Sequence, residues 1–172
     1  MVLALAALGL VSGYIVQRYE GLAPPFGVLA TFMPMLADTG GNSGSQSATL
    51  VVRALAVREV STGDILKVLW KEFKVGVPLA VMLGVFAFGR VLLFAEGSSR
   101  PKGQSVLTIA LAIAAALGLQ VLTATMIGVL LPLAAAKLKF DPAVVASPAL
   151  TTIVDITGLF IFFTTATLFL GI

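Results

Sequence analysis

The sequence predicts an all-α membrane protein with five transmembrane helices. Hydrophobic residues make up 59% of the 172 residues, and charged residues make up only 11%. Soluble domains carry roughly 25% charged residues, so this chain has too few charges to cover a water-exposed surface. One spanning helix needs about 20 apolar residues, and the length of the chain therefore accommodates roughly five spans with short connections and no separate soluble domain.

Short polar or turn-forming stretches separate the expected spans. The spans are expected at residues 1–18, 26–56, 64–95, 104–136 and 143–170, joined by turns or loops at residues 20–25, 96–103 and 137–142. Pro24-Pro25 is a natural helix start, and Pro78 predicts a kink in the third span. The apolar stretch 1–16 also resembles the core of a signal peptide, but no basic region precedes it and no cleavage site follows it.

The distribution of basic residues predicts the orientation of the chain in the membrane. Seven basic residues fall on one side: Arg53, Arg58, Lys67, Lys71, Lys74, Lys137 and Lys139. Four fall on the other: Arg18, Arg90, Arg100 and Lys102. The excess predicts a multi-pass protein of the cell membrane with a cytoplasmic N-terminus and an extracytoplasmic C-terminus. Residues 53–74 have the pattern of an amphipathic helix at the cytoplasmic interface, either a lipid-facing anchor or a site for a regulatory anion or partner.

The chain contains no His and no Cys. Disulfides, thiolate chemistry and the usual ligands of zinc and copper are therefore excluded. A metal site must be built from oxygen atoms, which suit Mg²⁺, Mn²⁺ and Ca²⁺. Without His or Cys there is no nucleophile–base set, so the sequence does not predict an enzyme. The small net charge of +3, with no basic cluster beside aromatic residues, gives no support to nucleic-acid binding.

Asp38 and Asp155 are acidic residues inside otherwise uncharged spans. An ionised residue at the centre of a bilayer costs about 2.5–3.5 kcal/mol, so it normally lines a water-filled path or locks two helices together. Helical spacing places each acid on a polar face. These faces are Pro34, Asp38, Gly41, Asn42, Ser45, Gln46 and Thr49 in the second span, and Pro148, Thr151, Thr152, Asp155 and Gly158 in the fifth.

The adjacent Gly40 and Gly41 are expected to bend or unwind the second span. Backbone carbonyls exposed in this way are tolerated at membrane depth only beside a cavity or packed protein. Together with hydroxyl, amide and carboxylate oxygens, they would form an oxygen-only lining for a hard cation. Because Mg²⁺ loses water reluctantly, such a lining is expected to hold the ion through its waters. Close helix packing is the alternative explanation for the small residues of this span.

Two long motifs resemble the MgtE family of magnesium transporters. The first is Gly-Gly-Asn-Ser-Gly-Ser-Gln-Ser-Ala at residues 40–48, followed by Val-Val-Arg-Ala-Leu-Ala at residues 51–56. The second begins with Leu-Pro-Leu at residues 131–133, continues through Asp141-Pro142, and ends with Thr-Thr-Ile-Val-Asp-Ile-Thr-Gly at residues 151–158. The resemblance covers the whole chain, and it implies one transmembrane cation-transport domain over residues 1–172.

The resemblance also implies a homodimer with a pore between its subunits, lined by the second and fifth helices. Asp155 matches the carboxylate of the central cation site. The resemblance implies Gly41, Ser45 and Thr49 on the second helix, and Thr151 and Gly158 on the fifth, as the positions around it. Asn42 joins the expected metal site because it lies on the same polar face. Some relatives have Asn in place of Ser45 and Gly in place of Asp38, so Asp38 is expected to add charge and alter the affinity or selectivity of the site.

The expected function is therefore conduction of largely hydrated Mg²⁺, with Mn²⁺ and Ca²⁺ as further candidates. One alternative is a Na⁺- or H⁺-coupled exchanger of the same fold, with Asp38 as the coupling carboxylate. Another is a membrane scaffold that transports nothing. Family members commonly carry cytosolic domains before the first span, including a CBS module. The chain begins within the first span, so either it is a shortened piece or it is a stand-alone pore.

Overall fold

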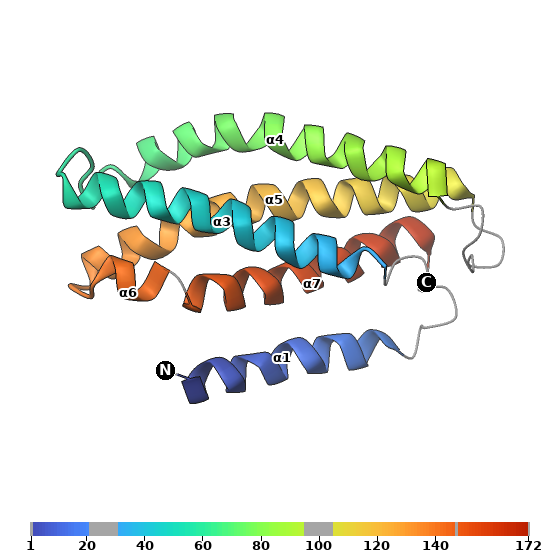
Figure 1. Ribbon diagram of the computed structural model, residues 1–172, viewed down its shortest axis with the longest axis horizontal. Helices are drawn as coiled ribbons and strands as arrows, with labels where there is room; N and C mark the ends of the chain where they lie inside the picture. Colours follow the sequence, from blue (N-terminus) through green and yellow to red (C-terminus); the bar gives the residue numbers. More distant parts are fainter. Residues whose placement is uncertain (1, 21–30, 95–104, 147, 172) are drawn as a thin grey trace.

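The computed structural model describes residues 2–20, 31–94, 105–146 and 148–171. Within these ranges the regular structure is entirely helical, which confirms the predicted all-α class. The helices are α1 (Val2–Glu20), α3 (Met33–Ala56), α4 (Ile65–Phe94), α5 (Val106–Lys137), α6 (Pro142–Ala146) and α7 (Pro148–Leu170). The long helices run side by side along the length of the molecule, and the short α6 lies at one end (Figure 1).

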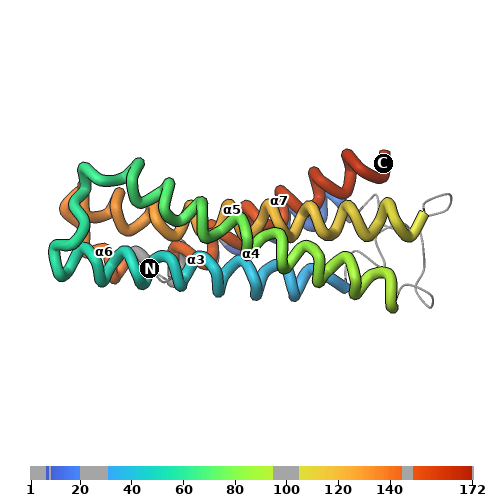
Figure 2. The backbone as a smooth tube through the Cα atoms, turned by 90° about the horizontal axis from the view of Figure 1, so that it is seen from above, coloured from blue at the N-terminus to red at the C-terminus, as the bar shows by residue number. Residues whose placement is uncertain are grey.

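Helix α5 is the centre of the bundle, because α3, α4 and α7 all pack against it (Figure 2). Small residues permit the closest of these contacts. Gly76, Ala80 and Gly84 recur every fourth residue on α4 and are buried. A Cβ atom at Gly84 would lie 3.2 Å from the carbonyl oxygen of Ala114 on α5. The α4–α5 contact therefore depends on the absence of large side chains along one stripe of α4.

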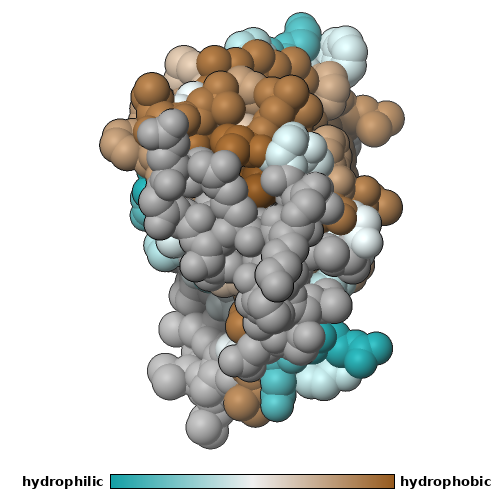
Figure 3. Space-filling view, turned by 90° about the vertical axis from the view of Figure 1, so that its right-hand side faces the viewer, coloured by the Kyte–Doolittle hydropathy of each residue, from teal (hydrophilic) through white to brown (hydrophobic). Residues whose placement is uncertain are grey.

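Helix α1 packs against α7 at the edge of the bundle (Figure 1). The rings of Tyr19 and Phe163 are stacked with their centroids 4.5 Å apart. The α1 side chains of Leu10, Val11 and Tyr14 are exposed. The outer surface of α4 is also apolar, with Val81, Phe86 and Leu93 exposed, and hydrophobic side chains gather at the top of the end view in Figure 3, where α4 lies. Lipid is the environment that such a surface requires.

By length and composition, three helices in the described part of the chain can cross a membrane: α4, α5 and residues 149–170 of α7. Helices α1 and α3 coincide with the first and second expected spans, but they are not among these three. Polar residues in the middle of α3 lower its apolar character, although it is a continuous 24-residue helix. The prediction of a multi-pass membrane protein is supported, and the number of five spans stays a prediction.

One detail of the predicted helices is wrong. The second span does not unwind at Gly40 and Gly41, because α3 is helical from Met33 to Ala56. In the fifth span, α6 ends at Ala146 and α7 begins at Pro148, and residue 147 between them lies outside the described residues. Proline suits the first position of a helix. Pro148 therefore explains the start of α7.

The structure describes the connection between the second and third expected spans, which the prediction places on the cytoplasmic side. Residues 65–74 form the first turns of α4 rather than a separate interfacial helix, and α4 continues through Pro78 as a bowed helix (Figure 1). In the preceding turn, the Asp64 carboxylate accepts hydrogen bonds from the hydroxyl and backbone N–H of Ser61, at 2.6 and 3.0 Å. These bonds hold the pKa of Asp64 below its ordinary value. The expected loop at 96–103 and residues 21–25 of the expected turn lie outside the described residues.

Candidate functional site

Helix α3 has two faces of opposite environment. Its inner face packs against α5 and α7 and consists of Leu36, Gly40, Ser43, Gly44, Ser47, Ala48 and Val51. Its outer face consists of the exposed residues Pro34, Asp38, Asn42, Gln46 and Thr49 and the half-buried residues Gly41 and Ser45. The residues of the predicted polar face therefore do lie on one side of α3, and that side points away from the core of the chain.

Hydrogen bonds within α3 organise part of the outer face. The Asn42 amide donates to the Asp38 carboxylate, with Nδ2 and Oδ1 3.2 Å apart. The Thr49 hydroxyl donates to the Ser45 carbonyl oxygen at 2.8 Å. These side chains are four residues apart, one turn along the helix. The bonds align oxygen atoms of several kinds along one side of α3: carboxylate, amide, hydroxyl and carbonyl.

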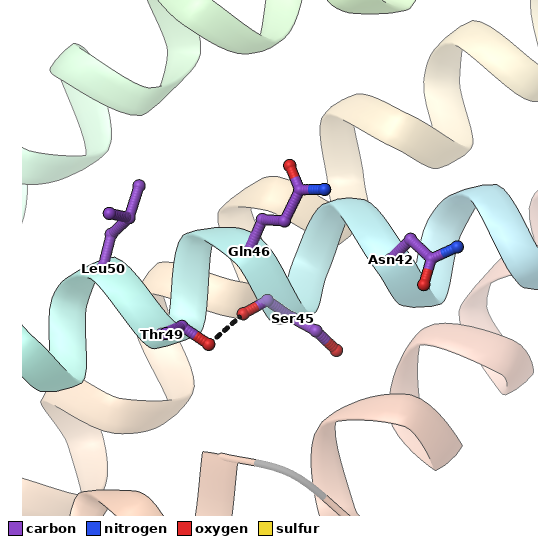
Figure 4. Close-up of a pocket in the computed structure, with 5 residues that line it drawn as sticks. All are labelled: Asn42, Ser45, Gln46, Thr49 and Leu50. Carbon is purple, nitrogen blue, oxygen red and sulfur yellow. Dashed lines mark hydrogen bonds between the residues drawn. The ribbon is translucent and has the colours of Figure 1, made fainter.

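A hollow of about 450 Å³ lies on this face, lined by Asn42, Ser45, Gln46, Thr49 and Leu50 (Figure 4). The Ser45 hydroxyl and Thr49 point to the side on which the α7 ribbon runs, while Gln46 and Leu50 point to the opposite side. The hollow is largely open to its surroundings, so a cation that keeps its first shell of water could lie against these oxygens.

Helix α7 places Asp155 at the edge of its buried face. Leu150, Val154 and Gly158 recur every fourth residue and are buried. The predicted stripe of the fifth span is therefore divided. Thr151 is exposed and Asp155 is half-buried one turn later, whereas Gly158 faces inward against Gln120 of α5. Thr152, the remaining threonine of the stripe, is half-buried.

The two predicted faces meet where α3 packs against α7. A Cβ atom at Gly44 would lie 3.4 Å from Cγ2 of Val154, and Ala48 belongs to the same buried cluster as Val154. Ser45 and Asp155 are the next residues along each helix, so the backbone contact sets them at one level of the bundle. No hydrogen bond joins the Asp155 carboxylate to another residue of the described ranges.

Few carboxylates lie near the level of Ser45 and Asp155. In the described part of the chain, no three acidic side chains come together in a group that could hold a metal ion. Asp38 and Asp155 are the acids that α3 and α7 contribute, and the remaining oxygens of the candidate site are neutral. Neutral oxygens and few charges suit a cation that keeps its waters better than one that is fully dehydrated.

Sequence reasoning missed two polar residues that link the helices. Gln120 is fully buried on α5, and its Nε2 donates to the Val154 carbonyl oxygen at 2.9 Å. Glu72 on α4 accepts a hydrogen bond of 2.9 Å from the Ser47 hydroxyl on the inner face of α3. Gln120 is an amide within a long apolar stretch, and that isolation is the signal that identifies it.

Comparison with known proteins places the chain in a family. The sequence profile of the MgtE family, described as a divalent cation transporter, matches residues 33–165. The chain belongs to the MgtE family. The matched region runs from the start of α3 to within α7, so it contains both polar faces. Family membership and the three apolar helices make the chain a transmembrane protein of a divalent cation transporter family, as the resemblance of the motifs predicted.

Three curated members of the MgtE family are similar to almost all of the chain. The magnesium transporter MgtE of Thermus thermophilus is 35% identical over 94% of the chain, and that of Bacillus subtilis is 33% identical over 95%. The magnesium transporter MgtE of Enterococcus faecalis is 28% identical over 98%. The alignments cover 34%, 34% and 35% of these proteins, so the chain spans about a third of the length of the relatives it matches.

Proposed function

We propose that the chain conducts Mg²⁺ in a largely hydrated form, through a pore formed between two copies and lined by α3 and α7. The observation that carries this proposal is the outer face of α3. A membrane-embedded helix cannot present Asp38, Asn42 and Gln46 to lipid without a large energetic cost, because lipid offers no hydrogen-bond partners. Water, together with the same face of a second copy, is the environment that fits this surface.

A two-fold arrangement would double the charge available to the ion. Each copy contributes Asp155 at the level of Ser45, and Asp38 further along α3 adds a second carboxylate. Neutral oxygens from Gly41, Asn42, Ser45, Thr49, Thr151 and Gly158 complete the predicted set. Ser45 and Thr49 line the hollow against which a hydrated ion would lie, whereas Gly158 is turned toward α5 and would contribute only through its backbone.

The membrane potential supplies enough energy for uptake. Moving one charge through 100 mV is worth about 2.3 kcal/mol, so a dication gains about 4.6 kcal/mol on moving inward. The chain contains no P-loop motif, and the proposed conduction needs no ATP. In the proposed orientation the N-terminus is cytoplasmic. Mg²⁺ is the ion proposed first because the relatives are named magnesium transporters, while oxygen ligands also admit Mn²⁺ and Ca²⁺.

The test is Mg²⁺ flux into liposomes that contain the purified chain. Asp155→Ala should abolish flux and Mg²⁺ binding while leaving a folded dimer, because it removes the carboxylate nearest the α3–α7 contact. Glu59→Ala is the matched control, since Glu59 is an exposed acid in the connection after α3. Wild-type Mg²⁺ flux in Asp155→Ala would refute the assignment.

The same liposomes distinguish the alternatives. A channel responds to the imposed voltage, whereas an exchanger that uses Asp38 as its coupling carboxylate responds to a Na⁺ or pH gradient. Calorimetric titration with Mg²⁺, Mn²⁺ and Ca²⁺ ranks the three ions. A scaffold that transports nothing would show no saturable binding of any of them.

A further inference from the structure

Gln120 occupies a position where three helices converge. Its side chain is fully buried in the middle of α5, between α3 on one side and α7 on the other. A Cβ atom at Gly40 of α3 or at Gly158 of α7 would collide with the Gln120 amide. The amide therefore fills a space that exists because both neighbouring helices carry glycine at this level.

The amide of Gln120 holds the backbone of α7 directly. Its Nε2 donates to the carbonyl oxygen of Val154 at 2.9 Å, and the Thr157 hydroxyl is 3.1 Å from the same oxygen. Val154 immediately precedes Asp155. The Asp155 side chain makes no hydrogen bond with the described residues, so the rotation of the α7 backbone determines on which side of the helix its carboxylate lies.

The other end of the amide has no partner. Oε1 of Gln120 is buried and accepts no hydrogen bond from any described residue. An apolar side chain of the same size would fill this space without an unsatisfied oxygen, and such replacements are often neutral or stabilising. A gain in folding stability therefore does not account for an amide at position 120. Its hydrogen bond to Val154 is the feature that an apolar side chain cannot reproduce.

We propose that Gln120 is a positioning residue for the ion site: its bond to Val154 fixes the rotation of α7 so that Asp155 faces the outer side of α3. This inference rests on the proposed role of Asp155 and adds a residue from a helix outside the proposed pore lining. Buried polar groups are best known for fixing the register of packed helices, and here the register determines where the carboxylate lies.

Gln120→Met separates positioning from stability, because Met has a similar length and no hydrogen-bonding amide. The full chain is titrated calorimetrically with MgCl₂ and unfolded thermally in the same detergent. We expect an unfolding temperature equal to or above that of the wild type, and Mg²⁺ affinity weakened at least tenfold. Thr125→Val is the matched control, since Thr125 is also buried on α5 but bonds its own helix at Leu122 and faces Gly76 of α4; its affinity should be unchanged.

Wild-type affinity for Mg²⁺ in Gln120→Met would overturn the inference, whatever its unfolding temperature. If Gln120→Met yields no folded dimer, Gly40→Ala decides the matter. The new Cβ displaces the flexible end of Gln120 from Val154 while keeping the amide in the chain. Tenfold weaker binding in Gly40→Ala supports the inference, and wild-type binding overturns it. Failure of the proposed function is recognised separately, by wild-type flux in Asp155→Ala.

Discussion

The two faces of α3 both carry glycine and serine, but their environments are opposite. Gly40, Gly44 and Ser47 on the inner face approach other helices closely, and a Cβ atom at Gly44 would lie 3.0 Å from the Ala124 carbonyl oxygen. Gly41 and Ser45 on the outer face are only half-buried, and nothing lies within 4 Å of a Cβ atom at Gly41. Small polar residues therefore serve packing on one side of the helix, and on the other side they border the proposed ion path.

The largest expected difference between the faces concerns Gly44 and Gly41. Gly44→Ala should lower the free energy of unfolding by about 1–3 kcal/mol, because the added methyl group meets backbone atoms of α5 that cannot move away. Gly41→Ala should leave it unchanged or raise it, since alanine is favoured over glycine within helices by about 0.8–1.0 kcal/mol. Unfolding curves in one detergent measure both variants, and equal destabilisation would show that the outer face is also packed.

The second prediction concerns transport through the outer face. The double substitution Asn42→Leu with Thr49→Val should reduce Mg²⁺ flux in liposomes at least tenfold, because it replaces the oxygens of the hollow with apolar groups. The unfolding temperature should change little, since both side chains are exposed. Ser12→Ala on α1, which packs against α7 at the edge of the bundle, serves as the control. Wild-type flux in the double variant would mean that the ion path does not follow this face.

The smallest effect is expected from the hydrogen bond that joins the inner face to α4. Ser47→Ala removes the donor to Glu72 and should cost about 0.5–1.5 kcal/mol of stability, because the acceptor is a half-buried carboxylate that water can still reach. Ser43→Ala should cost less, since the Ser43 hydroxyl bonds its own helix at the Thr39 carbonyl oxygen. A double-mutant cycle with Glu72→Gln isolates the coupling between the two helices. A coupling near zero would assign Ser47 to packing alone.

Helical spacing predicted the outer face of α3 correctly because a regular helix converts sequence separation into direction. It also predicted that Thr151 and Asp155 share a surface of α7. Gly158 shows the limit of the method. It follows Asp155 by three positions, which is compatible with one broad face, but α5 lies against part of that face and buries Gly158. Periodicity gives the relative directions of side chains on one helix and does not say which neighbour covers them.

The same limit explains the errors at the glycines and the residues that were missed. Gly40 and Gly41 suggested a flexible backbone, whereas Gly40 provides space for a side chain from a helix about 80 residues later in the sequence. Gln120 and Glu72 were not recognised, because their partners lie on other helices. A helix start at Pro148 was available from the sequence, but the apolar run across residues 143–170 favoured one span.

The sequence by itself determined the helical class, the membrane environment, the oxygen-only chemistry and the family, because composition and motif order are properties of the chain alone. It also determined which residues of each helix lie on a common side, since 3.6 residues complete a turn. The tertiary structure decided which of those sides is buried, and it set Asp155 at the level of Ser45 with Gln120 behind it. These decisions depend on contacts between helices distant in sequence, and such contacts are fixed only when the bundle packs.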